Sequence, residues 1–260
     1  MPATTTRGED PQDRAPFIAT GLRMSQRADV SALMLDRATL LANGIVGFEH
    51  DDPRNRTFAM LRSQVLRRLT GTGPHVLAVT STEAGSGKSF VAANLAAAMC
   101  QIHPVWLVDL DLRRPCVGER FGLPAAGGVD EYLTGGSAVA ARRCHVDKDR
   151  LTILPVAQPR ANSAQILASD RTASLFAHLR GLPEAPLCII DTPPVLEGDD
   201  VMIIAPHVDA ILLVVEEGRT RQAHLREILP MLRPTRVLGT VLNRTILPAQ
   251  ASPYGQYHAR

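Results

Sequence analysis

The chain has few aromatic residues and no long hydrophobic run. Aromatic residues make up 4% of its 260 residues, against 45% for hydrophobic residues of all kinds, so we expect a core built from aliphatic side chains and alanine. No apolar stretch approaches the about 18 residues of a membrane-spanning helix. The amino terminus also lacks the hydrophobic segment of a secretory signal. These absences favour a cytoplasmic chain.

Paired cysteines and a one-sided charge are also missing. The four cysteines lie far apart and form no Cys-x-x-Cys pair, which argues against a disulfide framework or a zinc site. The 28 Lys and Arg residues nearly balance the 26 Asp and Glu residues, leaving a net charge of +2. A protein dedicated to nucleic acid is usually far more basic, so no nucleic-acid partner is expected.

Short runs rich in Val, Ile and Leu alternate with helical patterns from residue 75 onward. Uninterrupted apolar runs are typical of strands that are buried on both faces. The alternation predicts an α/β fold, with a mostly parallel sheet covered by helices on both faces. The predicted strands are His75–Thr80, Val105–Asp109, Leu151–Leu154, Leu187–Asp191, Ala210–Val215 and Val237–Leu242. The predicted helices are Lys88–Ile102, Val129–Leu133, Thr172–Leu179, Val201–Ala205 and Arg221–Leu232.

Three regions are expected along the chain. Residues 1–55 are rich in Thr, Asp, Arg and Pro, with weak helical patterns at 28–35 and 35–42, and are interpreted as a loosely ordered or partner-dependent arm. Residues 56–247 form the α/β domain, beginning with a helix at 56–69. Residues 248–260 are polar and rich in helix breakers, and are expected to form a mobile tail.

The segment from Thr82 to Ser89 has the layout of a phosphate-binding loop. A β-rich run, a Gly-Ser-Gly-Lys-Ser turn and a helix-forming stretch follow one another, so backbone N–H groups and the positive end of a helix converge on phosphate oxygens. Lys88 can reach the β- and γ-phosphates, and the Ser89 hydroxyl can ligate Mg²⁺. Thr82 replaces the usual first glycine. The expected nucleotide-binding residues of this segment are Glu83, Ala84, Gly85, Ser86, Gly87, Lys88, Ser89 and Phe90.

Three aspartates stand at the carboxyl ends of two predicted strands. Asp109 and Asp111 end or follow one strand, and Asp191 ends another. In a parallel sheet these ends share the ligand-binding edge, which is also the edge of the phosphate loop. A single aspartate in such a place is often only a helix cap or a turn residue. Three of them beside Lys88 favour a site for a nucleoside triphosphate and Mg²⁺.

Three segments resemble the Walker A, A′ and B motifs of bacterial tyrosine kinases from capsule and exopolysaccharide biosynthesis, which are deviant-Walker P-loop ATPases. They are the phosphate loop, Leu-Val-Asp-Leu-Asp-Leu-Arg-Arg-Pro at 107–115, and Ile-Ile-Asp-Thr-Pro-Pro-Val at 189–195. The resemblance covers residues 56–245 and implies an ATP-dependent tyrosine autokinase that regulates polysaccharide polymerisation and export. The catalytic residues that it implies are Lys88, Asp109, Asp111 and Asp191.

The resemblance also assigns individual roles. Asp109 is the candidate base or orienting group for a tyrosine hydroxyl, Asn243 lies near the adenine, and Ser89, Asp111 and Asp191 hold the metal. ATP and Mg²⁺ are the implied cofactors. Tyr254 and Tyr257 in the tail are the implied phosphate acceptors.

The implied partners are a neighbouring subunit in a homo-oligomer and a membrane-embedded chain-length regulator, or co-polymerase, that recruits the chain to the inner face of the membrane. The sequence departs from the family pattern in two places. The tail holds two tyrosines rather than a long cluster. The subunit-contact motif Glu-x-x-Arg-x-x-Arg aligns with Arg56, Ala59 and Arg62, so only its last position is kept.

Two other functions compete with the kinase. A positioning ATPase usually carries a lysine early in the phosphate loop, where this chain has Glu83, so the sequence speaks against that class. An ATP-binding adaptor that acts through its assembly state alone shares every site residue with the kinase, so the motifs do not separate these two.

Overall fold

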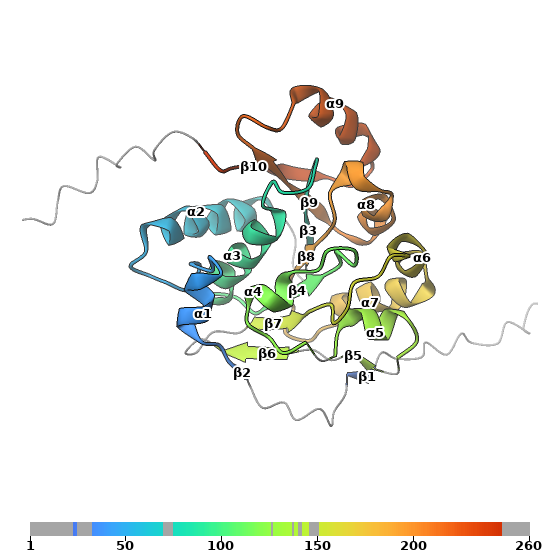
Figure 1. Cartoon of the computed structure of the whole chain (residues 1–260), viewed down its shortest axis with the longest axis horizontal. Coiled ribbons are helices and arrows are strands. Elements are labelled where there is room, and N and C mark those ends of the chain that lie inside the picture. Colours follow the sequence, from blue (N-terminus) through green and yellow to red (C-terminus); the bar gives the residue numbers. More distant parts are fainter. Residues whose placement is uncertain are drawn as a thin grey trace, which may run out of the picture.

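The computed structural model describes residues 23–24, 33–69, 75–125, 127–136, 138–139, 142–145 and 151–245. Its main feature is an eight-stranded sheet with the strand order β10-β9-β3-β8-β4-β7-β6-β2 (Figure 1). Neighbouring strands run parallel except β6 and β7, which are antiparallel. The mostly parallel sheet is therefore confirmed. The strands of this sheet are β2 (Leu33–Met34), β3 (His75–Ser81), β4 (Val105–Asp109), β6 (Arg142–His145), β7 (Leu151–Leu154), β8 (Leu187–Asp191), β9 (Ala210–Glu216) and β10 (Val237–Asn243).

Helices cover both faces of this sheet, as predicted. One apolar cluster joins α1 to α4 to the sheet, and a second joins α5 to α9 to its opposite face. In Figure 1 the two groups lie on opposite sides of the central strands. The helices are α1 (Arg37–Ala42), α2 (Pro53–Arg68), α3 (Lys88–Cys100), α4 (Val117–Arg120), α5 (Val129–Leu133), α6 (Ser163–Leu167), α7 (Asp170–Arg180), α8 (Asp200–Ile204) and α9 (Gln222–Met231). Two short 3₁₀ helices, η1 (Val195–Glu197) and η2 (Ala205–His207), and a separate pair of strands, β1 (Arg23–Met24) and β5 (Ala138–Val139), complete the described elements.

The central strand β3 shows how the apolar sequence pattern corresponds to packing on both faces of the sheet. Leu77 and Val79 join the α3 side of the core, whereas Val76 and Ala78 join the opposite side. Both faces of the strand are buried, which is why its sequence is apolar without alternation. Helix α3 is buried almost all round, and its many alanines allow it to lie close to the sheet. The nucleotide loop is thus held between two deeply buried elements.

The predicted boundaries lie within three residues of the observed ones for every predicted element. The weak helical pattern at 35–42 coincides with α1. The sequence did not predict α4 or α6, each of five residues or fewer, or the strands β1, β2, β5 and β6. These elements are too short for a periodic pattern to emerge.

The expectation of a loose arm over residues 1–55 is wrong for its described second half. Ile45, Val46 and Phe48 are buried. The side chain of Asn94 in α3 accepts hydrogen bonds from the N–H groups of Val46 (2.7 Å) and Gly47 (3.0 Å). A Cβ at Gly47 would lie 2.5 Å from the Asn94 carbonyl oxygen, so glycine permits this close approach. The segment packs on α3 although its sequence has no helical or strand period. The rest of the arm outside 23–24 and 33–55, and the predicted tail at 248–260, lie outside the described residues.

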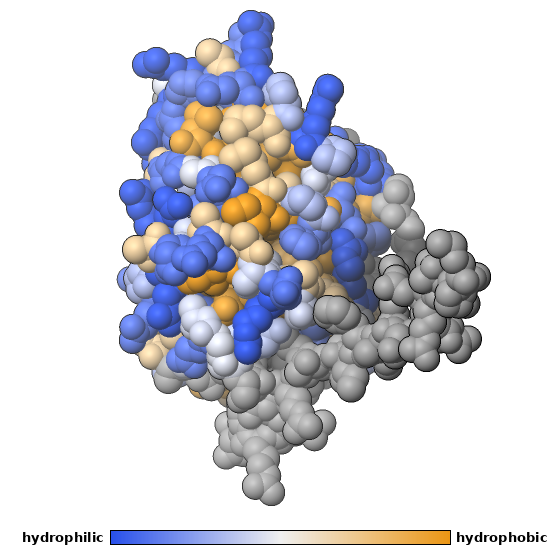
Figure 2. Space-filling view, turned by 90° about the vertical axis from the view of Figure 1, so that its right-hand side faces the viewer, coloured by the Kyte–Doolittle hydropathy of each residue, from blue (hydrophilic) through white to orange (hydrophobic). Residues whose placement is uncertain are grey.

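The surface gives no sign of a membrane-spanning element in the described part of the chain, where no helix is long and apolar enough to cross a bilayer. Figure 2 shows the right-hand side of Figure 1, where apolar side chains are interspersed with hydrophilic ones over the coloured residues. Large apolar side chains that are exposed include Met60 on α2 and Leu242 on β10.

Candidate active site

The phosphate loop connects the end of β3 to the start of α3, as the sequence predicted. Gly85 and Gly87 have φ angles of +85° and +88°, a region that side chains disfavour, so these two positions call for glycine. Thr82 is buried and is absent from the residues with positive φ. A glycine is therefore not required at the first position. The missing glycine of the usual pattern does not disturb the loop.

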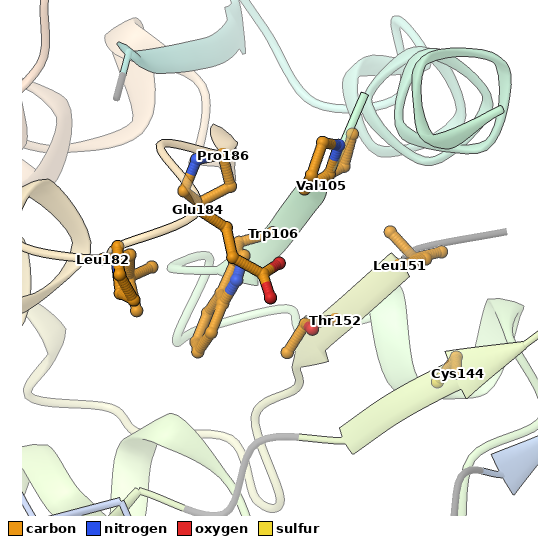
Figure 3. Close-up of a pocket in the computed structure, with 10 residues that line it drawn as sticks. Val105, Trp106, Cys144, Leu151, Thr152, Leu182, Glu184 and Pro186 are labelled. Atoms are coloured by element: carbon orange, nitrogen blue, oxygen red, sulfur yellow. The ribbon is translucent and has the colours of Figure 1, made fainter. Parts of the chain in front are cut away.

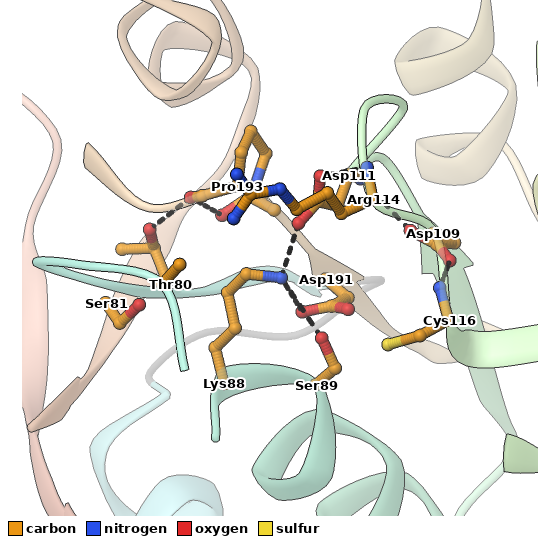
Figure 4. Close-up of polar contacts among 12 residues, drawn as sticks. Thr80, Ser81, Lys88, Ser89, Asp109, Asp111, Arg114, Cys116, Asp191 and Pro193 are labelled. Carbon is orange, nitrogen blue, oxygen red and sulfur yellow. Dashed lines mark hydrogen bonds and ion pairs between the residues drawn. The ribbon is translucent and has the colours of Figure 1, made fainter. Parts of the chain in front are cut away.

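Lys88, the first residue of α3, points at two of the three predicted aspartates (Figure 4). Its Nζ lies 2.6 Å from Oδ2 of Asp111 and 3.6 Å from Oδ1 of Asp191. It also donates a hydrogen bond of 3.1 Å to Oγ of Ser89. Burial lowers the pKa of Lys88, but the carboxylates of Asp191 and Asp111 outweigh it and raise the pKa overall. Lys88 therefore stays protonated and carries a permanent positive charge at the centre of the site.

Asp109 is held by backbone amides. Its Oδ1 accepts a hydrogen bond from the N–H of Asp111 (3.0 Å), and its Oδ2 accepts from those of Cys116 and Val117 (both 3.1 Å). The residue is fully buried. Burial first, and the neighbouring Asp191 second, raise the pKa of Asp109 to about 8. Asp109 therefore organises the turn that carries Asp111 and also provides a carboxylate with a raised proton affinity beside the lysine.

Asp191 is the least satisfied group of the site. It is fully buried, and neither carboxylate oxygen accepts a hydrogen bond in the described part of the chain. Burial raises its pKa against the opposing effect of Lys88. A buried carboxylate without hydrogen bonds is costly unless a cation accompanies it. The oxygens of Asp191 accept no hydrogen bond and only Oδ1 has an ion-pair partner, Lys88 at 3.6 Å, so they fit a divalent metal ion as a further cation.

The residues expected to hold the metal are brought together. Lys88 lies against Ser89, Asp111 and Asp191, so these three side chains share one small space. No group of three or more His, Cys, Asp or Glu residues forms an all-protein metal site within the described ranges. Mg²⁺ commonly takes only one or two carboxylates and completes its shell with water and substrate phosphates. The donor set fits such an ion.

A cavity of about 230 Å³ opens over the phosphate loop. Sequence reasoning missed several residues of its wall, because they come from distant segments and belong to no recognised phosphate-binding pattern. Arg114 stands in the Arg-Arg-Pro motif, so that motif was the one available signal. The cavity is lined by Ala84, Gly85, Gly87, Lys88, Ser89, Phe90, Asp111, Arg114, Arg120, Pro194, Glu197 and Arg244. Three arginines thus add positive charge to a cavity wall that also carries the carboxylates of Asp111 and Glu197.

Two predicted nucleotide-binding side chains have other contacts. Glu83 faces His224 of α9, with 2.5 Å between Oε1 and Nδ1, so only its backbone remains for the phosphate loop. Asn243 at the end of β10 donates a hydrogen bond of 2.9 Å to the carbonyl of Ser86, which fastens the loop to the sheet. Tyr254 and Tyr257 lie outside the described residues.

The carboxylate of Glu197 contacts two groups that would otherwise be available to bind a phosphate. Its Oε1 accepts a hydrogen bond from the N–H of Ala84 (3.0 Å), and its Oε2 lies 3.5 Å from Nη1 of Arg114. A carboxylate in this position competes with a triphosphate for one loop amide and one guanidinium. Glutamine keeps the size of the side chain and removes the charge.

We therefore expect Glu197→Gln to tighten ATP binding by about two- to fivefold, the scale of one partly exposed charge interaction. Titration calorimetry measures the change, with Glu184→Gln at the opposite edge of the sheet as the matched control. Weaker binding in Glu197→Gln would show instead that the carboxylate holds the loop in its binding-competent form.

No family model matches the chain. The tyrosine-protein kinase wzc of Salmonella typhi is 32% identical over 158 residues, which are 60% of this chain and 20% of the relative. The succinoglycan biosynthesis transport protein ExoP of Rhizobium meliloti (strain 1021) is 30% identical over 205 residues, 75% of this chain and 26% of the relative. The chain thus spans about a fifth to a quarter of the length of these two relatives.

Among solved structures, the crystal structure of the VpsO kinase domain matches with a TM-score of 0.65 and 31% identity, over 74% of this chain and 96% of that domain. This match extends beyond the motifs to almost the whole of a folded kinase domain. The chain therefore belongs to the family of bacterial tyrosine kinases.

Proposed function

We propose that the chain is an ATP-dependent tyrosine autokinase that regulates the polymerisation and export of exopolysaccharide or capsule. The observation that carries the proposal is the contact of Lys88 with Asp111 and Asp191 at the start of α3. A positive charge and two carboxylates thus lie together beside the phosphate loop. These are the parts that phosphoryl transfer from a nucleoside triphosphate needs.

Phosphate binding follows from the loop and its helix. The backbone N–H groups from Ala84 to Ser89 and the positive end of α3 attract the phosphate oxygens. Lys88 moves from the carboxylate of Asp111 to the β- and γ-phosphates, since its flexible stem allows a short shift. Arg114 and Arg120 at the cavity wall offset the charge that develops on the transferring group.

Ser89, Asp111 and Asp191 would hold Mg²⁺, whose chemistry is to neutralise the charge of the phosphate oxygens and to fix their geometry. The protein contributes the rigid placement of these donors. Asp111 is fixed because its Oδ1 accepts a hydrogen bond of 3.0 Å from the N–H of Arg114. Asp191 is fixed by its position at the end of β8, in register with Asp109 of β4.

Asp109 is the proposed proton acceptor for the incoming tyrosine hydroxyl. The hydroxyl has an ordinary pKa near 10. A carboxylate with a raised pKa reduces the pKa difference between proton donor and acceptor, which favours proton transfer. Burial raises the pKa of Asp109, which brings its proton affinity closer to that of the tyrosine hydroxyl. Its three backbone hydrogen bonds keep the carboxylate oriented.

The proposed acceptors are Tyr254 and Tyr257. Tyr254 follows the last described residue, Thr245, by nine positions, which span about 30 Å when extended. This reach is enough for the active site of a neighbouring subunit. We expect mass spectrometry after incubation with Mg-ATP to find phosphate on one or both tyrosines, and none on the tail of the Tyr254→Phe/Tyr257→Phe double variant.

ATP hydrolysis is the control for the tail experiment, because the double variant leaves the site intact and hydrolysis should persist. An unmodified wild-type tail alongside active hydrolysis would contradict autokinase activity and favour an ATP-binding adaptor. Loss of hydrolysis in the double variant would place the tyrosines in the site itself.

A membrane-embedded polysaccharide co-polymerase is the proposed partner, and it would recruit the chain to the inner face of the membrane. The relative ExoP is named as a transport protein, and the chain matches about a quarter of it. Self-association is proposed for the exposed side of α2, which carries Arg56 and the 61% exposed Met60. Arg62 is less suited to that role than its motif position suggests, since its Nη1 donates 2.8 Å to the Ala98 carbonyl near the end of α3.

A further inference from the structure

A second cavity lies at the edge of the sheet opposite the phosphate loop. It has a volume of about 280 Å³ and is formed by the amino-terminal ends of β4 and β7 together with the loop that precedes β8. Figure 3 shows these segments around the opening. The cavity is lined by Pro104, Val105, Trp106, Cys144, Leu151, Thr152, Leu182, Pro183, Glu184 and Pro186. None of these residues belongs to the proposed kinase site.

The floor of this cavity is aromatic. Trp106 is half-buried, and the imidazole of His178 in α7 packs against it edge to face, with 6.4 Å between the ring centroids and 69° between the planes. Prolines and Leu182 form the remaining apolar wall. The indole is thus held in place while part of it remains open to the cavity.

One carboxylate stands over this apolar floor. In Figure 3 the carboxylate of Glu184 lies beside the Trp106 ring and faces Thr152. Glu184 has no hydrogen bond or ion pair with any residue in the described ranges. Among the residues that the structure describes, the cavity therefore combines an indole, apolar walls and a single negative charge without a partner.

We propose that this cavity binds the side chain of an arginine presented by a partner protein. A flat guanidinium can stack on the indole and donate two parallel hydrogen bonds to the Glu184 carboxylate. The apolar walls then cover the aliphatic stem of the side chain.

Other ligand classes fit this cavity less well. A neutral apolar group would cover the Glu184 carboxylate without pairing it, which is costly. An anionic group would be repelled by the same carboxylate. A lysine could pair with Glu184, but its compact ammonium stacks less well on the indole than a planar guanidinium.

The single tryptophan of the chain makes this proposal directly measurable. Trp106 is the only tryptophan in the sequence, so its fluorescence reports the cavity alone. We titrate the protein with N-acetyl-arginine amide and with N-acetyl-citrulline amide, which has nearly the same shape and no charge. A saturable change at millimolar arginine amide is expected, with citrulline amide binding at least about tenfold more weakly.

The variant Glu184→Gln tests the carboxylate. Glu184 is exposed, so the substitution should not disturb folding, and the unchanged emission of the free protein checks this. Arginine amide should then bind no more tightly than citrulline amide. Equal responses to the two ligands in the wild type, or no saturable change with arginine amide, would overturn the proposal.

A second variant tests whether this cavity is independent of the proposed kinase site. Lys88→Met removes the phosphate-binding lysine at the other edge of the sheet and should leave the arginine titration unchanged. Loss of arginine binding in Lys88→Met would show that the two sites are not independent and would overturn the assignment of binding to the cavity alone.

Discussion

Replacing Lys88 by methionine should lower ATP turnover by at least about a hundredfold, the usual effect of removing one group that stabilises transition-state charge. Methionine keeps most of the volume and the unbranched shape of the side chain but removes the ammonium. The amine now contacts both Asp111 and Asp191. Without it, the triphosphate meets two carboxylates that no lysine offsets, so binding and transfer should both weaken. Steady-state ATPase kinetics with purified protein measure the change.

The sequence offers a matched control, because Lys88 and Lys148 are its two lysines. Lys148 precedes β7 by three positions in the sequence and belongs to none of the phosphate-binding motifs. Lys148→Met should therefore keep wild-type turnover. Wild-type turnover in Lys88→Met, with a cooperative thermal transition that shows a folded protein, would refute the assigned role of the phosphate loop.

The second large effect is expected for Asp191→Asn, which should lower Mg²⁺-dependent turnover by orders of magnitude. An amide of equal size keeps the packing but cannot offset the cation. The carboxylate accepts no hydrogen bond in the described structure, so its replacement removes no hydrogen bond and only the 3.6 Å ion pair with Lys88, which keeps its closer contact with Asp111. Thermal unfolding in EDTA should therefore stay close to that of the wild type.

ATP affinity should respond to Asp191→Asn with opposite signs in the two conditions. In EDTA the substitution removes a negative charge near the triphosphate, so ATP should bind more tightly. With Mg²⁺ present it removes a metal ligand, so ATP should bind more weakly. Asp170→Asn, an exposed aspartate on α7, is the control and should change neither value. Weaker ATP binding in both conditions would assign Asp191 a structural role instead.

The sequence predicted the parts of the site that lie on buried strands. Asp109 and Asp191 end apolar runs, and strands of this kind must end at one edge of a parallel sheet. The register pairs these two residues directly. The loop was predictable because Gly85 and Gly87 take positive φ angles. At these positions the local sequence pattern and the tertiary structure call for the same residue types.

The sequence could not predict contacts that depend on close tertiary approach. Residues 45–48 have no period, and their order comes from the side chain of Asn94, some fifty positions away. Arg120 and Arg244 reach the cavity from segments without a phosphate-binding pattern. The contact of Glu197 with the phosphate loop was likewise not predictable from the sequence, because its hydrogen bond from Ala84 depends on how the turn after β8 lies against the loop.

Phosphotyrosine formation tests the central claim most directly. Purified protein is incubated with γ-labelled ATP and the labelled amino acid is identified, with Mg²⁺ or with EDTA, for the wild type and for Lys88→Met. The account predicts labelled tyrosine in the wild type with Mg²⁺, and none in EDTA or in the folded Lys88→Met variant. Labelled tyrosine of equal amount in Lys88→Met, or no labelled tyrosine in a wild type that hydrolyses ATP, would contradict it.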